Sequence, residues 1–441
     1  MGSRSRFRGG TGRLTFAWNG PGMGLPGERK HMNHLQRTRR LIRLALTLGL
    51  LVATVAAYPA AAQAAGTVRQ RPTAHIGAAW GSNLNGHLGN GSGVSSSTYV
   101  TVSGPRNISQ ISDGNSSSLA VTADGSVYAW GYNGYGELGT DDQTNYPSPQ
   151  LVAGLSGITQ VAAGWTHSLA LGAGGTVWAW GDNSFGELGN GTTTQSLTPV
   201  QVPGLTGVTQ IAAGNGWSLA LRSDGTVWGW GGNQWDQLGS GPTVIATPVQ
   251  IPGLTRVTSI AAGAFFGMAV QNRNLYSVLN QVLTWGQDTD ATIGNGTACW
   301  CGEPTPQVVP GLNVGDVEGI AAGAEHAMVL GTDGSVWGWG DGTYGDLGDN
   351  SQYAEPRPVL AIGPGSGIVQ LAAGTGDTVA LLSNGTVEAW GSNQDGELGG
   401  GFTSFDSLTP VTVTGLSGVS QIAAGGNTSQ AVQTVFQLTL R

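Results

Sequence analysis

The segment TVWAWGDNSFGELGNG, residues 176–191, decides the fold, because the chain repeats it. It starts as a strand-like run with two tryptophans and then breaks into glycine, asparagine and acidic residues. The Trp-Gly pair recurs at intervals of 50 to 55 residues, at Trp80, Trp130, Trp180, Trp230, Trp285, Trp339 and Trp390. Self-similarity at such a period is the signature of a repeat architecture, so the chain holds seven copies of one unit.

A second motif, usually Ile-Ala-Ala-Gly and called the marker below, leads each unit. The markers begin at Ile111, Val161, Ile211, Ile260, Ile320, Leu371 and Ile422. In five of the six complete units the tryptophan follows the first marker residue by 19 positions. Asp-Gly or Asn-Gly pairs between alternating apolar runs indicate tight hairpins. About four short strands per unit are typical of propeller blades.

The repeat therefore predicts an all-β fold, a seven-bladed propeller of four-stranded blades within residues 75–441. Trp80 has no marker before it, and the marker at Ile422 has no Trp-Gly pair after it. We expect the N- and C-terminal segments to share one blade, with residues 75–80 pairing beside residues 429–432. Such pairing closes the ring and removes an open sheet edge. The C-terminal segment TVFQLTLR, residues 434–441, is an alternative occupant of that strand position.

The compound motif, as in AAGWTHSLAL from residue 162 and GTVWAWGDNSFGELGNG from residue 175, resembles the repeat of the regulator of chromosome condensation family. The resemblance covers residues 75 to about 433. It implies a seven-bladed propeller, with protein interaction as the common theme. The founding member is a guanine-nucleotide exchange factor for a nuclear small GTPase and docks on chromatin. Bacterial-type exported relatives include a propeller that inhibits β-lactamases.

The N-terminal region differs from the repeats. Residues 32–64 combine an arginine-rich start, an apolar run and small residues suited to cleavage, which is the layout of a secretory signal peptide. A signal anchor that is never cut is the alternative. We interpret residues 1–31 as a non-native or disordered extension and residues 65–74 as a linker. We expect a secreted or cell-surface protein with no membrane segment after signal removal.

The charge distribution argues against a nucleic-acid partner. The chain has 18 basic and 26 acidic residues, and ten of the basic but only one of the acidic residues precede Ala64. The remainder has eight arginines, no lysine and 25 acidic residues, a net charge near −17. Such a surface repels phosphate backbones. We expect a monomer without cofactor that binds a protein and no nucleic acid.

The positions directly after each marker vary while the repeat around them does not. Because they fall at equivalent points of all blades, we expect them to ring one mouth of the central channel, as loops on a rigid scaffold. The predicted partner-binding residues are Trp165, His167, Asn215, Trp217, Phe265, Phe266, Glu325, His326 and Asp377. Trp217 is predicted to be a solvent-facing anchor. For each histidine alone, a hydrogen bond between blades is the alternative.

A further aromatic set follows the Trp-Gly pairs. It comprises Tyr135, Phe185, Trp235 and Tyr344, and we expect it on the face opposite the marker loops. Stacking on neighbouring glycine-rich turns would explain these rings without a binding role. The seven repeated tryptophans themselves are expected in the blade cores, because an aromatic residue in every copy indicates packing.

Carboxylates recur in the Gly-Glu-Leu-Gly motif, at Glu137, Glu187, Asp346 and Glu397. They occur one per blade, whereas catalysis needs an asymmetric cluster, so a structural role in the turn is expected. Cys299 and Cys301 are the only cysteines. Two thiolates cannot complete a zinc site, and we favour a loop disulfide over free or intermolecular thiols, with a metal site as the remaining alternative.

These observations favour an exported, non-enzymatic propeller that binds a protein through a ring of loops on one face. A guanine-nucleotide exchange factor, as in the founding family member, is the first alternative, although the leader and the negative charge disfavour it. An extracellular glycan-active enzyme is the second, and it would need an asymmetric group of acids.

Overall fold

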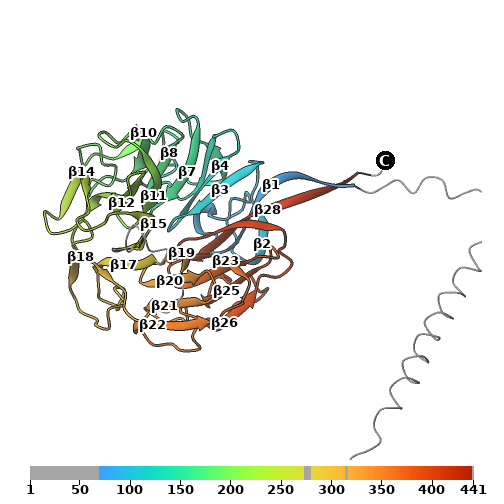
Figure 1. Cartoon of the computed structure of the whole chain (residues 1–441). Coiled ribbons are helices and arrows are strands. Elements are labelled where there is room, and N and C mark those ends of the chain that lie inside the picture. Colours follow the sequence, from blue (N-terminus) through green and yellow to red (C-terminus); the bar gives the residue numbers. More distant parts are fainter. Residues whose placement is uncertain (1–68, 273–279, 313–315, 440–441) are drawn as a thin grey trace, which may run out of the picture. The chain divides into compact units, whose positions relative to one another are not determined.

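The computed structural model describes residues 69–272, 280–312 and 316–439, which form seven four-stranded antiparallel sheets arranged as the blades of a ring (Figure 1). The expected all-β, seven-bladed propeller is confirmed. In this part of the chain the helical structure is one 3-10 turn, η1 (Leu84–Gly86), and no helix could span a bilayer. The predicted extension, signal peptide and first linker residues lie outside the described residues.

Blades 1 to 6 are each made of four consecutive strands. Their strands are, for blade 1, β3 (Ile108–Asp113), β4 (Ser117–Thr122), β5 (Val127–Gly131) and β6 (Tyr146–Leu151); for blade 2, β7 (Ile158–Ala163), β8 (His167–Gly172), β9 (Val177–Gly181) and β10 (Ser196–Gln201); and for blade 3, β11 (Val208–Ala213), β12 (Trp217–Arg222), β13 (Val227–Gly232) and β14 (Val244–Gln250). They are, for blade 4, β15 (Val257–Ala262), β16 (Phe266–Asn272), β17 (Asn280–Gln287) and β18 (Gly302–Val308); for blade 5, β19 (Val317–Ala322), β20 (His326–Gly331), β21 (Val336–Gly340) and β22 (Glu355–Ile362); and for blade 6, β23 (Ile368–Ala373), β24 (Asp377–Leu382), β25 (Val387–Ser392) and β26 (Asp406–Thr412).

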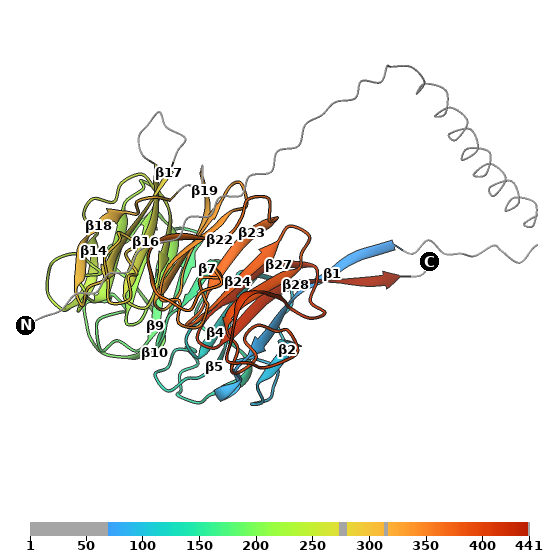
Figure 2. The same ribbon diagram turned by 90° about the horizontal axis from the view of Figure 1, so that it is seen from below.

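Blade 7 combines both ends of the propeller, as Figure 2 shows. Its strand order is β2 (Ser96–Thr101), β1 (Arg69–Gly81), β28 (Thr428–Thr439) and β27 (Val419–Ala424). Trp80 pairs with Ser429, and Gly77 pairs with Val432, in the expected register. The C-terminal segment does not replace the N-terminal strand. It continues β28 and pairs with the first residues of β1.

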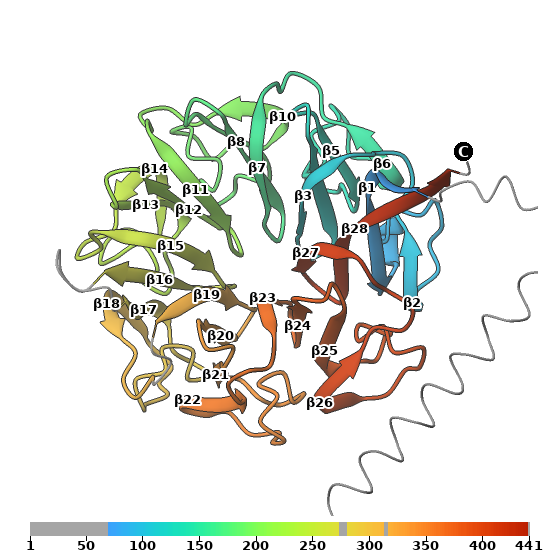
Figure 3. The ribbon, with the colours of Figure 1, turned by 45° about the vertical axis from the view of Figure 1, so that its right-hand side comes forward.

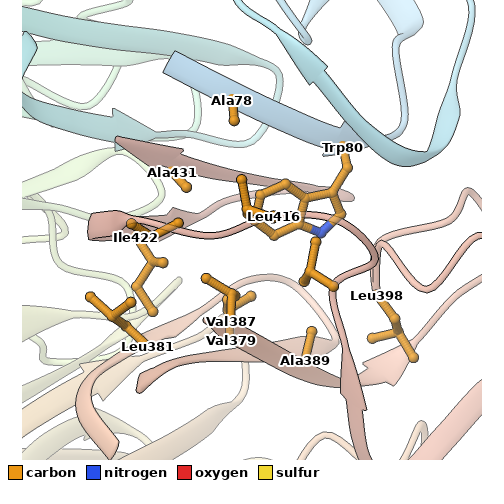
Figure 4. Close-up of a cluster of buried hydrophobic side chains, with 12 residues drawn as sticks. Ala78, Trp80, Val379, Leu381, Val387, Ala389, Leu398, Leu416, Ile422 and Ala431 are labelled. Carbon is orange, nitrogen blue, oxygen red and sulfur yellow. The ribbon is translucent and has the colours of Figure 1, made fainter. Parts of the chain in front are cut away.

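The inner strands of the blades lie around the centre of the ring (Figure 3). The apolar cores lie between neighbouring blades. In the described part of the chain there are seven such clusters, and each holds one tryptophan of a Trp-Gly pair. Figure 4 shows the cluster between blades 6 and 7, where Trp80 lies among Val387, Ala389 and Leu398. Trp80 is fully buried, as are its six counterparts.

Each repeated tryptophan also makes a polar contact with the preceding blade. Trp180 Nε1 donates to the main-chain oxygen of Glu137 at 2.8 Å, and the other six indoles make the equivalent bond. Gly139 packs against this indole, since a Cβ atom there would lie 2.9 Å from Trp180 Nε1. The Trp-Gly pair and the Gly-Glu-Leu-Gly turn are therefore two halves of one contact between blades.

Glutamines of the inner strands add a second contact between blades. Gln160 accepts from Ile211 N at 3.0 Å and donates to Ile211 O at 3.3 Å, so its amide imitates a strand backbone. Gln110, Gln210 and Gln370 bond to the next blade in the same way, and Gln421 accepts the corresponding bond from Ile111. Blades 4 and 5 have Ser259 and Gly319 at this position.

Candidate binding face

The loops after the markers and the loops after the Trp-Gly pairs lie on one face, not on opposite faces as expected from the sequence. Asp182 N, which begins a Trp-Gly loop, donates to Thr166 O of the marker loop at 2.9 Å. The chain runs up the first strand, down the second and up the third, so the first and third strands of a blade end on the same side. We call this side the loop face.

Five of the nine predicted binding residues are buried at the start of the second strand. These are His167, Trp217, Phe266, His326 and Asp377, each at most 1 % exposed. The polar side chains of this set bond to the neighbouring blade. The prediction that Trp217 faces solvent is therefore wrong: its Nε1 donates to Ala264 O of blade 4 at 2.8 Å.

The two histidines follow the alternative interpretation and connect neighbouring blades. His167 Nε2 lies 2.9 Å from Ser218 Oγ of blade 3. Because Ser218 Oγ donates its own proton to Glu187 O at 3.0 Å, it accepts the proton of His167 Nε2, which fixes the neutral tautomer. Burial lowers the pKa of His167 to about 4, and His326 makes the same contact with Thr378 at 3.0 Å. Both rings are structural.

The other four predicted residues remain accessible. Trp165, Asn215, Phe265 and Glu325 are half-buried on the marker loops, one or two positions before the buried set. Trp165 lines the channel mouth together with marker residues of all seven blades, which are alanine and glycine in six blades and Asp113 and Gly114 in blade 1. No comparison tests a binding role for these residues, so that role stays a prediction.

The aromatic set of the Trp-Gly loops joins the same face. Phe185 packs on Gly216 of the next blade, where a Cβ atom would lie 3.2 Å from the ring, and Tyr344 packs on Gly376 at 3.1 Å. Stacking on glycine-rich turns therefore occurs, as the simpler interpretation proposed. Tyr135 and Phe185 nevertheless keep exposed edges.

Six other exposed side chains of this face were not among the predicted residues. They are Leu84, Val94, Trp300, Tyr353, Phe402 and Phe405, all in Trp-Gly loops. Trp300 is 88 % exposed and Tyr353 is 79 % exposed. Trp300 stands out in the sequence between the two cysteines, whereas Tyr353 and Phe405 lie where the repeat has no motif. A disulfide joins Cys299 and Cys301, with 5.2 Å between their Cα atoms.

The repeated carboxylates stabilise the turns. Glu137 Oε2 accepts from Tyr135 N at 2.8 Å, and Glu187 Oε2 accepts from Phe185 N at 2.7 Å. Burial raises the pKa of both carboxyls to about 7. In blade 3, Gln237 makes the same bond to Trp235 N at 3.0 Å, so the turn does not need a charge.

A buried polar cluster fastens blade 7 to blade 1. Asp113 replaces an alanine of the first marker, and its Oδ1 lies 2.8 Å from His87 Nε2. Thr428 Oγ1 donates to Asp113 Oδ2 at 2.8 Å, and Ser118 and Gln430 also donate to this carboxylate. The side chains of His87 and Asp113 are 4 % and 0 % exposed, so substrate has no access. In the described part of the chain no group of three His, Cys, Asp or Glu side chains is placed to hold a metal ion.

Family models match most of the propeller. An RCC1-like domain model matches residues 77–317, and regulator of chromosome condensation (RCC1) repeat models match residues 317–346, 333–381 and 384–432. The first match alone covers more than half of the chain.

Curated relatives and solved structures agree on the fold. The ultraviolet-B receptor UVR8 of Arabidopsis thaliana is 33 % identical over 156 residues, which is 34 % of each chain. The human E3 ubiquitin-protein ligase HERC2 is 33 % identical over 165 residues, 35 % of this chain but 3 % of the ligase. The matches thus span 34 % of the first relative and 3 % of the second. The structure of Prp20p from Saccharomyces cerevisiae aligns with a TM-score of 0.73 at 23 % identity, covering 83 % of this chain and 93 % of that one. The structure of human WBSCR16 aligns with a TM-score of 0.72 at 23 % identity, covering 82 % of this chain and 99 % of that one.

Proposed function

Because the chain belongs to the family of proteins built on the RCC1-like domain, we propose that it is a non-enzymatic propeller that binds a protein partner through its loop face. The observation that carries this proposal is the concentration of exposed apolar side chains there. Of thirteen large hydrophobic residues that are exposed in the described part of the chain, eight lie in Trp-Gly loops. Clustered apolar surface on one face is typical of interaction sites.

Relatives support a binding role for the fold. The structure of Prp20p was described together with its binding properties to Gsp1p and histones, and a second structure holds this yeast protein bound to Kap60. The repeated acids support the absence of catalysis in our chain, because Glu137, Glu187 and Glu397 each accept a main-chain bond within their own turn, and Asp346 Oδ2 lies 3.2 Å from Nδ1 of the fully buried His326. We expect no nucleic-acid partner, since the chain after residue 64 has no lysine and eight arginines against 25 acidic residues.

We place this binding outside the cytoplasm, with the propeller acting as a monomer. The support is the signal-like pattern of residues 32–64, and a disulfide between Cys299 and Cys301 is typical of an oxidising compartment. Recovery of the protein from the culture medium, with its N-terminus between residues 60 and 75, would agree with export. An intact leader in cytosolic protein would contradict it.

The binding proposal is tested with two matched variants. Tyr135→Ser with Phe405→Ser removes exposed rings of the loop face, and Leu151→Ser with Leu360→Ser removes exposed leucines of the outer strands β6 and β22. Wild-type protein is cross-linked to its partner in medium from the producing cells, and the captured protein is identified and titrated. We expect only the loop-face variant to lose affinity.

Equal loss in both variants would contradict the proposal. So would catalytic activity: accelerated nucleotide release from a small GTPase would favour an exchange factor, and release of sugars from a glycan panel would favour a glycan-active enzyme.

A further inference from the structure

Trp300 is the most exposed of the large hydrophobic side chains in the described part of the chain, and its backbone is tied down on both sides. The disulfide brackets it. Cys299 N donates to Asp288 O at 2.9 Å, and Asp288 N donates to Cys301 O at 3.1 Å. An indole on such a fixed loop loses little conformational entropy when it is covered, which favours its use as a binding anchor.

A second tryptophan lies beside this loop. Gly302, two residues after Trp300, packs against the main chain of Trp235 in blade 3, in a contact too close for a Cβ atom. The side chain of Trp235 is half-buried. This main-chain contact places Asp236, the next residue of blade 3, beside the loop that carries Trp300.

Carboxylates lie beside this contact. Asp236 Oδ2 lies 3.2 Å from where a Cβ atom of Gly302 would be, and Glu303 is the second residue of β18 (Gly302–Val308). Asp288 is fully buried beneath the loop, where burial and the nearby charge of Glu303 raise its pKa. Arg357 packs on Gly296, six residues before Gly302 in the same loop. Asp236 and Glu303 thus give the Gly302 end of the loop two neighbouring carboxylates.

We propose that the Trp300 patch, formed by Trp300, Asp236 and Glu303, receives a lysine or arginine side chain from a basic segment of the protein partner. Aromatic faces attract cations, and carboxylates at the rim add hydrogen bonds and charge complementarity. The propeller already contains one such pairing, because Arg222 lies 5.7 Å from the ring centre of Trp228. This inference rests on the proposed function and adds to it the chemistry of the partner.

The test uses the whole secreted protein and a fluorescein-labelled octa-arginine peptide, with octa-glutamate and a glycine-serine octamer as comparison peptides. Binding is followed by fluorescence anisotropy at low and moderate salt. We expect saturable binding of octa-arginine alone. Trp300→Ala should raise Kd about fivefold or more, and Trp300→Phe should restore part of the affinity, as a cation–π contact requires. Asp236→Asn with Glu303→Gln should weaken binding and reduce its salt dependence.

Two control variants locate the effect. Tyr353→Ala removes another exposed ring of the same face, and Asp124→Asn with Asp224→Asn removes two charges from hairpin turns on the opposite face. Both should bind octa-arginine like the wild type.

The proposal is overturned if octa-arginine does not bind, if the neutral peptide binds equally well, or if Tyr353→Ala weakens binding as much as Trp300→Ala. A natural partner that is lost with the loop-face variant but kept with Trp300→Ala would leave the proposed function standing and refute the Trp300 patch.

Discussion

The substitution Glu137→Gln replaces the buried carboxyl of the turn in blade 1 by the amide that Gln237 provides in blade 3. It should change how the unfolding free energy depends on pH. Glu137 is 1 % exposed, and burial raises the pKa of its carboxyl from 4.5 to about 7. A folded-state pKa above the unfolded value contributes stability below the unfolded pKa, and this contribution disappears as the pH rises through the folded pKa. Glu137→Gln keeps the acceptor for Tyr135 N and cannot ionise, as Gln237 demonstrates in blade 3.

The magnitude follows from the shift. A rise of the pKa from 4.5 to about 7 corresponds to about 3 kcal/mol, at about 1.4 kcal/mol per pKa unit. Relative to wild type, the variant should therefore gain about 3 kcal/mol of unfolding free energy between about pH 4.5 and about pH 8.

Urea unfolding of both proteins across this range measures the difference. The reciprocal change, Gln237→Glu, introduces a carboxyl at the equivalent buried position and should lose stability over the same interval. If the unfolding free energies of Glu137→Gln and wild type differ by the same amount at both ends of the pH range, burial does not govern the titration of the Glu137 carboxyl and the reasoning fails.

Three further changes test the packing. Trp217→Ala should lower the unfolding free energy by roughly 3–5 kcal/mol, as should Trp180→Ala, because both indoles are fully buried; calorimetry that finds either variant as stable as wild type would place that ring outside the core. Gln160→Ala removes two hydrogen bonds to the next blade and should cost about 1–3 kcal/mol, while Ser259→Ala at the equivalent site without such bonds should cost less; equal losses in urea unfolding would deny the glutamines a role between blades. Deleting residues 75–81 should lower the melting temperature of the whole propeller, and an unchanged melting curve would show that the ring closes without them.

The repeat made the fold predictable because its two motifs recur at nearly constant spacing along the chain. A tryptophan in every copy must do the same thing in every blade, and burial between blades is the one environment that all copies share. The closure of blade 7 was predictable for the same reason, since Trp80 needs a marker and the marker at Ile422 needs a tryptophan.

The candidate site was less predictable because one position along a strand decides burial. Phe265 and Phe266 are adjacent, yet one is accessible on the loop and the other lies between blades. The side chain that faces inward cannot be chosen without knowing where the second strand begins. The Trp-Gly loops were predicted on the opposite face, but two antiparallel strands separate a marker loop from the next Trp-Gly loop, and this brings the chain back to the same face.

Asp113 was visible in the sequence only as a departure from the marker. Its partners His87 and Thr428 both lie in blade 7, across the closing junction, and a contact of this kind leaves no local pattern. The glutamine contacts between blades also could not be predicted from the sequence. Each glutamine bonds to the main chain of the next unit, so the residue type there is free to vary.

The pairing of β1 with β28 also sets the timing of assembly. His87 and Thr428, which meet at the closing junction, are 341 residues apart, whereas each of blades 1 to 6 is continuous in sequence. Those six blades can form in order as the chain is made, but β1 must wait, with an unpaired edge, until β28 follows. Loop-closure entropy makes so distant a pairing slow. The nascent protein therefore passes through an open ring, and the two ends of this ring expose apolar surface that the closed propeller buries. It needs protection from aggregation most during this interval.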